Sequence, residues 1–174
     1  VILKPSIVYS VDDNFTTNFM TLLNRLPVMP LYYEGKTKFA PIHVSDLTQI
    51  IFDVVDGKVN EQTIECIGPE ILSFKEIIVK LLKTIDKKRL LIPLPLILAK
   101  MSAKIFEMMS NPLITQDQIN LLKYDNIPSG KYKTNFDLDL KANRVFDNEI
   151  EKYSFNWRDG GQYSRDKFFM KNND

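Results

Sequence analysis

The sequence predicts an α/β fold, in which short strands alternate with helices before the chain becomes mainly helical. Three observations predict it. Runs rich in Ile, Val and other strand-forming residues at positions 1–9, 39–44 and 63–67 are typical of strands. Apolar residues at helical spacing separate these runs. The rest of the chain has marked helix starts but few strand patterns, so the strands would need further sheet with which to pair.

The first strand is expected over residues 1–9, with Pro5 at an edge, a bulge or a strand end. A helix follows, capped by one residue of the Asp12-Asp13 pair. Its apolar stripe at helical spacing consists of Phe15, Phe19, Leu22, Leu23 and Leu26. Two prolines are expected to end this helix, Pro27 and Pro30.

The next segment begins with a turn at residues 34–36, where Gly35 is free to adopt a positive φ. A strand over residues 39–44 leads to a helix that Ser45 caps, with Asp46 in its first turn. The buried face of that helix is expected to consist of Leu47, Ile50, Ile51, Val54 and Val55. The third strand, residues 63–67, ends at a Gly-Pro pair.

Two capping boxes mark helix starts in the second half of the chain, at residues 73–76 and 115–118. Between them, residues 95–109 form an amphipathic pattern with lysines opposite an apolar face. A short helix is expected over residues 140–151, and the polar tail from residue 171 is expected to fray.

Composition excludes several classes of function. The net charge of +1 does not predict a nucleic-acid surface or an acidic substrate. The lone cysteine, Cys66, is expected to be a small buried residue of a strand. It cannot form an internal disulfide, so a reducing compartment is expected. A single histidine, His43, excludes a multi-histidine metal site. The longest apolar run, residues 90–99, is too short to span a bilayer, which takes about 20 residues.

The chain also lacks the motifs that bind phosphates or perform proton transfer. It has no G-x-G-x-x-G and no P-loop among its six glycines. Tyr32 is followed by Lys36 at the Tyr-x-x-x-Lys spacing, but Gly35 places this pair on a turn rather than on a helix. No G-x-S-x-G elbow accompanies His43, so serine-hydrolase chemistry is not predicted.

Five segments together resemble one family, the extended and atypical short-chain dehydrogenase/reductases. The segment Lys4-Pro5-Ser6-Ile7-Val8-Tyr9 resembles their R-P-S-x-V-[FY] strand end. Residues 35–47 are similar to the turn-strand-helix pattern G-x-T-x-F-x-P-[IV]-[HY]-V-x-D-[LV], and residues 65–77 are similar to the element that ends in [ST]-[FY]-x-E-[IL]. Residues 91–95 resemble an apolar-Pro-x-Pro step, and residues 157–163 resemble a terminal Arg-x-x-Gly-Gln-aromatic motif.

The order of these segments most resembles bacterial relatives of the NAD(P)-binding accessory subunit of respiratory complex I, often described as NAD-dependent epimerases or dehydratases. The resemblance implies that this chain, which opens on Val1, is the C-terminal portion of a Rossmann-like NAD(P)-binding protein. Residues 1–68 would complete the Rossmann-like domain, 69–170 would form a mainly helical substrate-side lobe, and 171–174 a tail. The cofactor, NAD or NADP, would be held mainly by the preceding half, which is the first expected partner.

The resemblance also implies site residues. In relatives the Pro-Ser-x-Val segment lies against the nicotinamide, so the cofactor contacts are expected to be Pro5, Ser6, Ile7 and Val8. The substrate side is expected to include Lys4, Tyr9 and His43. No catalytic residue and no metal ligand is predicted. Two departures matter: Lys4 replaces an arginine and cannot make its bidentate contact, and Ser10 stands where glycine is common.

Three functions remain open at this point. The intact protein is an epimerase, dehydratase or reductase, of which this chain supplies the substrate-side part without being active alone. Alternatively it is a non-catalytic NAD(P)H-binding subunit of a respiratory NADH dehydrogenase, docking through the helix at residues 95–109. A free-standing binding module is the third. The expected location is cytoplasmic, and peripheral at the inner face of the membrane for the respiratory subunit.

Overall fold

The computed structural model describes residues 1–94 and 120–161. Three predictions fall on other residues: the amphipathic helix at 95–109, the second capping box at 115–118 and the tail from 171. The described elements, in chain order, are β1 (Ile2–Pro5), β2 (Val8–Tyr9), α1 (Thr16–Arg25), β3 (Val28–Tyr32), a 3-10 turn (Tyr33–Gly35), β4 (Lys38–Phe39), β5 (Ile42–His43), α2 (Val44–Val55), β6 (Thr63–Cys66), β7 (Leu72–Ser73), α3 (Phe74–Thr84), β8 (Leu90–Leu94), β9 (Lys133–Thr134), a second 3-10 turn (Phe136–Leu138), α6 (Phe146–Tyr153) and a third 3-10 turn (Ser154–Trp157).

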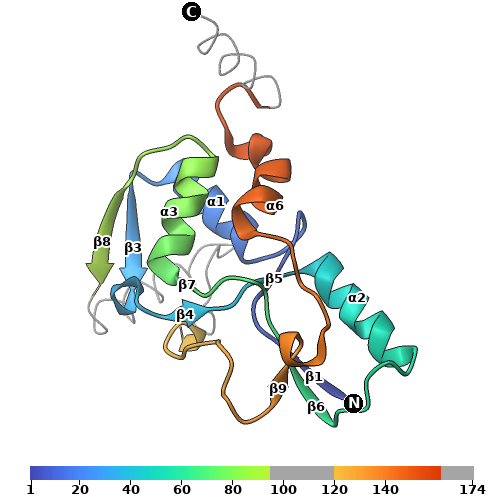
Figure 1. Cartoon of the computed structure of the whole chain (residues 1–174). Helices are drawn as coiled ribbons and strands as arrows, with labels where there is room; N and C mark the ends of the chain where they lie inside the picture. Colours follow the sequence, from blue (N-terminus) through green and yellow to red (C-terminus); the bar gives the residue numbers. More distant parts are fainter. Residues whose placement is uncertain (95–119, 162–174) are drawn as a thin grey trace, which may run out of the picture.

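The strands pair mostly in parallel, which confirms the α/β fold class (Figure 1). β6 lies between β1 and β9 in a three-stranded parallel sheet, so β1 is an outer strand. Two further parallel pairs are β2 with β5 and β3 with β8, and the pair of β4 with β7 is antiparallel. Parallel pairing of strands distant in sequence requires crossover connections, and the intervening helices provide them.

The expected strand at residues 1–9 is divided in two. β1 ends at Pro5, one of the positions expected for this proline, and β2 begins at Val8. Between them the Ser6 N–H donates to the Cys66 carbonyl at 3.0 Å, so the chain leaves β6 there and moves on to pair with β5. The expected strand at 39–44 is likewise divided into β4 and β5, and its last residue, Val44, begins α2.

The strand β3 was not predicted. α1 ends at Arg25, before Pro27, but Pro30 does not end a helix; it lies inside β3 opposite Ile92 of β8. A proline cannot donate to a strand ladder and is tolerated where one side of the strand is unpaired. β8 is the one partner of β3 in the described part of the chain, so β3 meets this condition.

Helix α2 differs most from its expected pattern. Its cap is His43 rather than Ser45, because the His43 ring nitrogen Nδ1 accepts the Ser45 N–H at 3.2 Å. Of the expected buried face only Ile50 is fully buried; Ile51 and Val55 are 44% and 81% exposed. Leu47 and Val54 are partly buried against the smaller hydrophobic cluster, so the predicted face is confirmed at these positions and at Ile50. The prediction was wrong for Ile51 and Val55, because α2 contacts the rest of the described chain along a narrow line only.

The two described helices of the second half, α3 and α6, differ in how they begin. The capping box of α3 is confirmed: the Ser73 side chain accepts the Glu76 N–H at 3.2 Å, and the Glu76 carboxylate accepts the Ser73 N–H at 2.7 Å. The helix expected at 140–151 is shifted, because α6 begins only at Phe146. The residues before it are held extended by side chains from elsewhere, and the Phe146 N–H is accepted by the Glu70 carboxylate at 3.1 Å.

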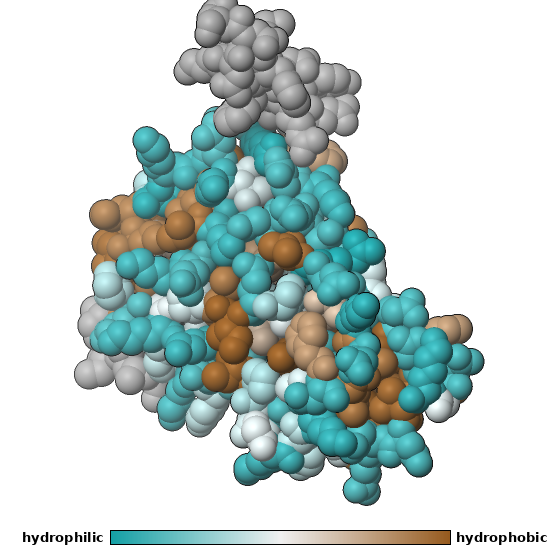
Figure 2. Space-filling view, in the orientation of Figure 1, coloured by the Kyte–Doolittle hydropathy of each residue, from teal (hydrophilic) through white to brown (hydrophobic). Residues whose placement is uncertain are grey.

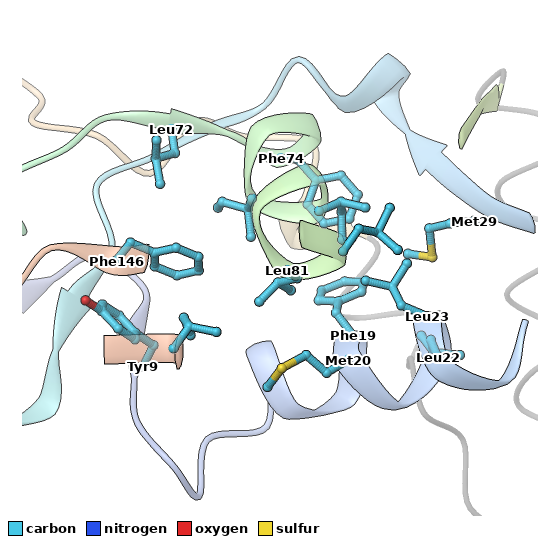
Figure 3. Close-up of a cluster of buried hydrophobic side chains, with 14 of the residues drawn as sticks. Tyr9, Phe19, Met20, Leu22, Leu23, Met29, Leu72, Phe74, Leu81 and Phe146 are labelled. Carbon is cyan, nitrogen blue, oxygen red and sulfur yellow. The ribbon is translucent and has the colours of Figure 1, made fainter. Parts of the chain in front are cut away.

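Two hydrophobic clusters stabilise the part of the chain that the structure describes. The larger one lies between α1, α3, α6 and β3 and contains Phe19, Leu23, Phe74, Leu81 and Phe146 (Figure 3). The smaller one, around β6, contains Ile42, Ile50, Ile64, Cys66, Leu140 and Ala142. Cys66 is fully buried, as expected, and burial raises the pKa of its thiol to about 11. The larger cluster draws residues from both sides of position 68; the division into domains there stays a prediction.

Candidate functional site

A cavity of about 500 Å³ opens next to the segment that follows β1. Ligand-binding cavities in proteins have volumes of this order. Ile7 and Val8, just beyond the carboxyl end of β1, form one side of it. The other sides come from α1 and the turn before it, from β4, and from residues 121–126, which we call the returning segment. The residues that line these sides are Asn14, Phe15, Asn18, Phe19, Phe39, Leu121, Leu122, Tyr124, Asp125 and Asn126.

Three phenylalanines form a continuous aromatic wall of this cavity. The Phe15 ring lies 5.1 Å from that of Phe19 in an edge-to-face arrangement and 6.0 Å from that of Phe39, between ring centroids. The start of α1 positions the first two, because the Asp13 carboxylate accepts the N–H groups of Phe15 and Thr16, at 2.6 and 2.5 Å. The N-cap residue of α1 is Phe15 rather than an aspartate, but Asp13, one of the two aspartates expected there, binds the main chain at the start of the helix and orients the aromatic wall.

The returning segment is fixed to the cavity through main-chain contacts. The Asn126 carbonyl accepts both the Ser6 hydroxyl, at 2.8 Å, and the Ala40 N–H, at 3.1 Å. The Asp125 carboxylate accepts the Lys38 N–H at 2.8 Å and places a negative charge at the exposed rim. These contacts join residues more than 80 positions apart, so no local pattern predicts them.

The expected cofactor residues occupy different environments. Pro5 is exposed at the end of β1, and Ile7 and Val8 line the cavity. Ser6 is only 6% exposed, and its hydroxyl both donates to the Asn126 carbonyl and accepts the Ala40 N–H. The segment Pro5 to Val8 thus borders the cavity through Ile7 and Val8, and the Ser6 hydroxyl holds its main chain to residues 40 and 126.

The three expected substrate residues do not lie together. Lys4 is exposed, and its ammonium lies 4.2 Å from the centroid of the Tyr132 ring. Tyr9 is fully buried; its hydroxyl donates to the Arg144 carbonyl at 3.3 Å, and burial raises the pKa of its phenol. Its ring contacts the His43 ring edge-to-face at 5.2 Å, so Tyr9 and His43 are neighbours, and neither is among the residues that line the cavity.

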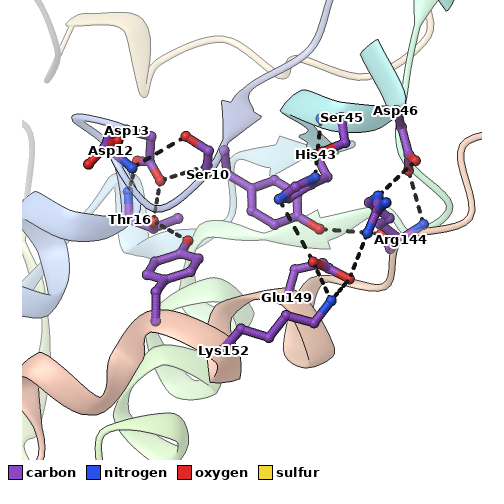
Figure 4. A network of polar contacts seen from close by, with 12 residues as sticks. Ser10, Asp12, Asp13, Thr16, His43, Ser45, Asp46, Arg144, Glu149 and Lys152 are labelled. Carbon is purple, nitrogen blue, oxygen red and sulfur yellow. Dashed lines mark hydrogen bonds and ion pairs between the residues drawn. The ribbon is translucent and has the colours of Figure 1, made fainter. Parts of the chain in front are cut away.

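His43 belongs to a polar network that the sequence did not predict (Figure 4). Its Nε2 lies 3.8 Å from the Glu149 carboxylate, which also pairs with Lys152 at 2.7 Å and with Arg144 at 3.4 Å. Arg144 continues to Asp46 of α2 at 3.3 Å. The spacing of Glu149 and Lys152 was the one local signal, whereas the contact between positions 46 and 144 depends on the fold. The network attaches α2 to α6.

The protonation of His43 is coupled to this structure. The imidazole nitrogen that caps α2 must be unprotonated to accept the Ser45 N–H. Burial lowers the pKa of His43, and the charge of Glu149 opposes this effect without cancelling it. For Glu149 burial acts to raise the pKa, but the hydrogen bond and charge of Lys152, together with His43 and Arg144, lower it overall.

We expect the free energy of unfolding to fall as the pH drops from 7 toward about 5.5. Because the folded-state pKa of His43 lies below the ordinary value of about 6.5, the unfolded chain binds the proton more readily in this window. Urea unfolding across the window measures the effect. His43→Asn keeps a side-chain acceptor at the cap and does not titrate, so its stability should change less over the same window. Equal slopes for both proteins would contradict the assignment.

The residues described here do not hold phosphates as a dinucleotide site does. Ile7 and Val8 provide an apolar wall of the cavity. A cradle for the pyrophosphate needs a glycine-rich turn at a helix start, and the sequence has none. In the described part of the chain no three His, Cys, Asp or Glu side chains are grouped as metal ligands, and no helix there is long and apolar enough to cross a membrane.

An α/β chain with parallel strand pairs and a cavity beyond the carboxyl end of a strand has the features of the Rossmann-like class. A scan against protein-family models found no match. The chain is 25% identical over 171 residues to the mitochondrial NADH dehydrogenase (ubiquinone) 1 alpha subcomplex subunit 9 of Arabidopsis thaliana, with 92% of this chain and 42% of the relative covered. The chain thus spans less than half the length of that relative.

Solved structures show the same fold. The dTDP-glucose 4,6-dehydratase DesIV of Streptomyces venezuelae, solved with NAD bound, has a TM-score of 0.53 at 15% identity and covers 90% of this chain and 42% of its own. The UDP-glucose 4-epimerase of Thermotoga maritima has a TM-score of 0.52 at 9% identity, with coverages of 95% and 46%. The resemblance stated from the motifs is confirmed: the chain is homologous to the NADH dehydrogenase subunit and shares the fold of the extended short-chain dehydrogenase/reductases.

Proposed function

We propose that this chain is the C-terminal, substrate-side part of an NAD(P)-binding protein of the epimerase, dehydratase or reductase class. The observation that carries the proposal is the cavity beyond β1, lined by Ile7 and Val8 of the Pro-Ser-x-Val segment. In open α/β sheets, ligands bind beyond the carboxyl ends of the strands, and these two residues lie there.

The proposal assigns the dinucleotide itself mainly to residues outside this chain. β1 is an outer strand of its sheet, and Ile2 on it is 56% exposed, which suits a further strand beside it. Residues Pro5 to Val8 would contact the nicotinamide end of the cofactor, with a main-chain N–H bonding the carboxamide. Lys4 would face the substrate space, and Tyr9 and His43 would support the site from behind.

The test combines DNA sequencing with an NADPH titration. We expect the coding DNA directly upstream of Val1 to encode a strand, a glycine-rich turn and a Tyr-x-x-x-Lys helix in frame. NADPH fluorescence should then show tight binding to the extended protein, and weak or no binding to the 174-residue chain. Tight binding of NADPH by the 174-residue chain would contradict the proposal, as would a start codon close to Val1.

A matched pair of proline variants tests whether the segment at Pro5 contacts the cofactor. In the extended protein, Pro5→Ala should raise the Kd for NADPH about threefold or more, because proline fixes φ where the chain turns toward the cavity. Pro69→Ala changes a second exposed proline outside the cavity lining and should leave the Kd unchanged. An equal response of both variants would place the cofactor elsewhere.

A second candidate function is a non-catalytic NAD(P)H-binding subunit of a respiratory NADH dehydrogenase, peripheral at the cytoplasmic face of the membrane. The relative from Arabidopsis thaliana, named as a subunit of NADH dehydrogenase, favours it. Exposed apolar side chains on α2, among them Phe52 at 59% and Val55 at 81%, suit burial against another protein (Figure 2). Turnover of a small substrate that depends on NAD(P)H or NAD(P) favours the enzyme. Co-purification with respiratory subunits that survives mutation of the upstream Tyr/Lys pair favours the subunit.

A further inference from the structure

We propose that the cavity beyond β1 binds an uncharged ligand with an aromatic ring and a hydroxyl or carbonyl group, rather than a nucleotide sugar. This inference names the ligand class of the site proposed above and, for any turnover, rests on that proposed function. The binding itself concerns only residues of this chain. It is argued from the aromatic wall, the charge at the rim and the amide groups there.

The walls of the cavity match a flat apolar ring. The Phe15 ring lies 5.1 Å from the Phe19 ring and 6.0 Å from the Phe39 ring, and Ile7 and Val8 line the same cavity. Aromatic rings prefer edge-to-face or offset contacts at such separations, and a further ring would extend the series. Leu121 and Tyr124, 70% and 65% exposed, lie at the mouth, where a bound ring would cover them.

The charge of the lining disfavours a nucleotide sugar. Its diphosphate needs cationic side chains or a row of main-chain N–H groups at a helix start. Among the described lining residues there is no lysine or arginine, and the one charged group is the Asp125 carboxylate. Lys123 lies nearby, with its ammonium 5.4 Å from the centroid of the Tyr124 ring, but it is not among the lining residues. A diphosphate would thus meet a negative charge at the rim.

The polar groups of the lining suit an uncharged oxygen. Asn14, Asn18 and Asn126 each present a side-chain amide, which both donates and accepts hydrogen bonds. Only main-chain atoms of Asn126 take part in the contacts that fix the returning segment. Among the described residues no hydrogen bond joins the side-chain amide of Asn14, Asn18 or Asn126 to another group, so each can bond a hydroxyl or carbonyl group of a ligand. A few such groups in an apolar site set the orientation of a ligand.

The test uses three probes on the 174-residue chain: 2-naphthol, naphthalene-2-sulfonate with the same ring and a negative charge, and UDP-glucose. Ligand-observed saturation-transfer NMR over a concentration series gives each Kd. We expect saturable binding of 2-naphthol, with the sulfonate and UDP-glucose weaker by about tenfold or more. Circular dichroism and cooperative urea unfolding establish that the chain used is folded.

Two variants of α1 locate the binding. Asn18→Trp fills the cavity and should weaken 2-naphthol binding about tenfold or more, whereas Asn24→Trp, at an exposed position of the same helix outside the lining, should leave it unchanged. Asp125→Asn keeps an acceptor for the Lys38 N–H and removes the charge, so it should strengthen binding of the sulfonate.

Several results would overturn the inference. These are binding of UDP-glucose that displaces 2-naphthol, absence of 2-naphthol binding to the folded chain, and equal effects of the two tryptophan variants. None of them involves NADPH. A failure here is therefore distinguishable from a failure of the proposed function, which the NADPH titration of the extended protein decides.

Discussion

Replacing Gly68 by alanine should destabilise the chain severely, by at least about 3 kcal/mol or to the point that it does not fold. A Cβ atom at this position would lie 1.7 Å from the carbonyl oxygen of Pro41 and 2.7 Å from its carbonyl carbon. Both are main-chain atoms and cannot rotate away. The Gly68 N–H also donates to the Ala40 carbonyl at 3.1 Å. To make room for the Cβ atom, the main chain at residue 68 would have to move away from residues 40 and 41.

Gly57→Ala is the matched control for this substitution. Gly57 has a positive φ of 77°, but nothing lies within 4 Å of the position of an added Cβ. Its replacement should cost only about 1–2 kcal/mol, for the left-handed backbone conformation. Urea unfolding followed by circular dichroism compares the two variants. A Gly68→Ala chain no less stable than Gly57→Ala would show that the close approach of the two segments is wrong.

Replacing Phe74 by alanine should lower the free energy of unfolding by about 3–5 kcal/mol. Phe74 is the first residue of α3 and is fully buried, and its ring packs edge-to-face against Phe19 at 5.1 Å. Its removal leaves a cavity at the contact between α1 and α3. Because Phe19 also lines the candidate site, the aromatic wall of that site should loosen as well.

Phe52→Ala provides the comparison for Phe74. Phe52 lies on α2 and is 59% exposed, so its truncation should change the stability by no more than about 0.5 kcal/mol. Both variants remove the same side chain from a helix, and the difference between them isolates burial. Urea midpoints at constant slope measure it. Similar losses for the two would mean that α2 is covered in solution.

The structure confirms what depends on neighbours in sequence. The capping box at Ser73, the turn with positive φ at Gly35 and the strand end at Pro5 each involve residues within about four positions of one another. Such contacts need no distant part of the chain, so a local sequence pattern is enough to predict them. The order of five short motifs likewise identified the class of protein and drew attention to Ile7 and Val8 as residues of the site.

Expectations that required knowledge of exposure were less accurate. The periodic pattern of α2 was real, but periodicity does not reveal whether anything covers the helix, and Val55 is 81% exposed. The strand β3 contains a proline, which argues against a strand unless one of its sides is unpaired. His43 replaced Ser45 as the cap of α2 because its ring is held between Tyr9 and Glu149, and neither contact is local.

By itself, then, the sequence determined the α/β class, the start of α3, the family resemblance and the segment on which the candidate site is built. Only the tertiary structure decided that Phe39 and Asn126 complete a cavity with that segment, and that Arg144 and Glu149 join α6 to α2. The physical reason is the range of the interactions. Caps and turns are formed within one helical turn of chain, whereas a cavity and an ion-pair network require groups about 80–100 positions apart to be packed together, which only the folded chain achieves.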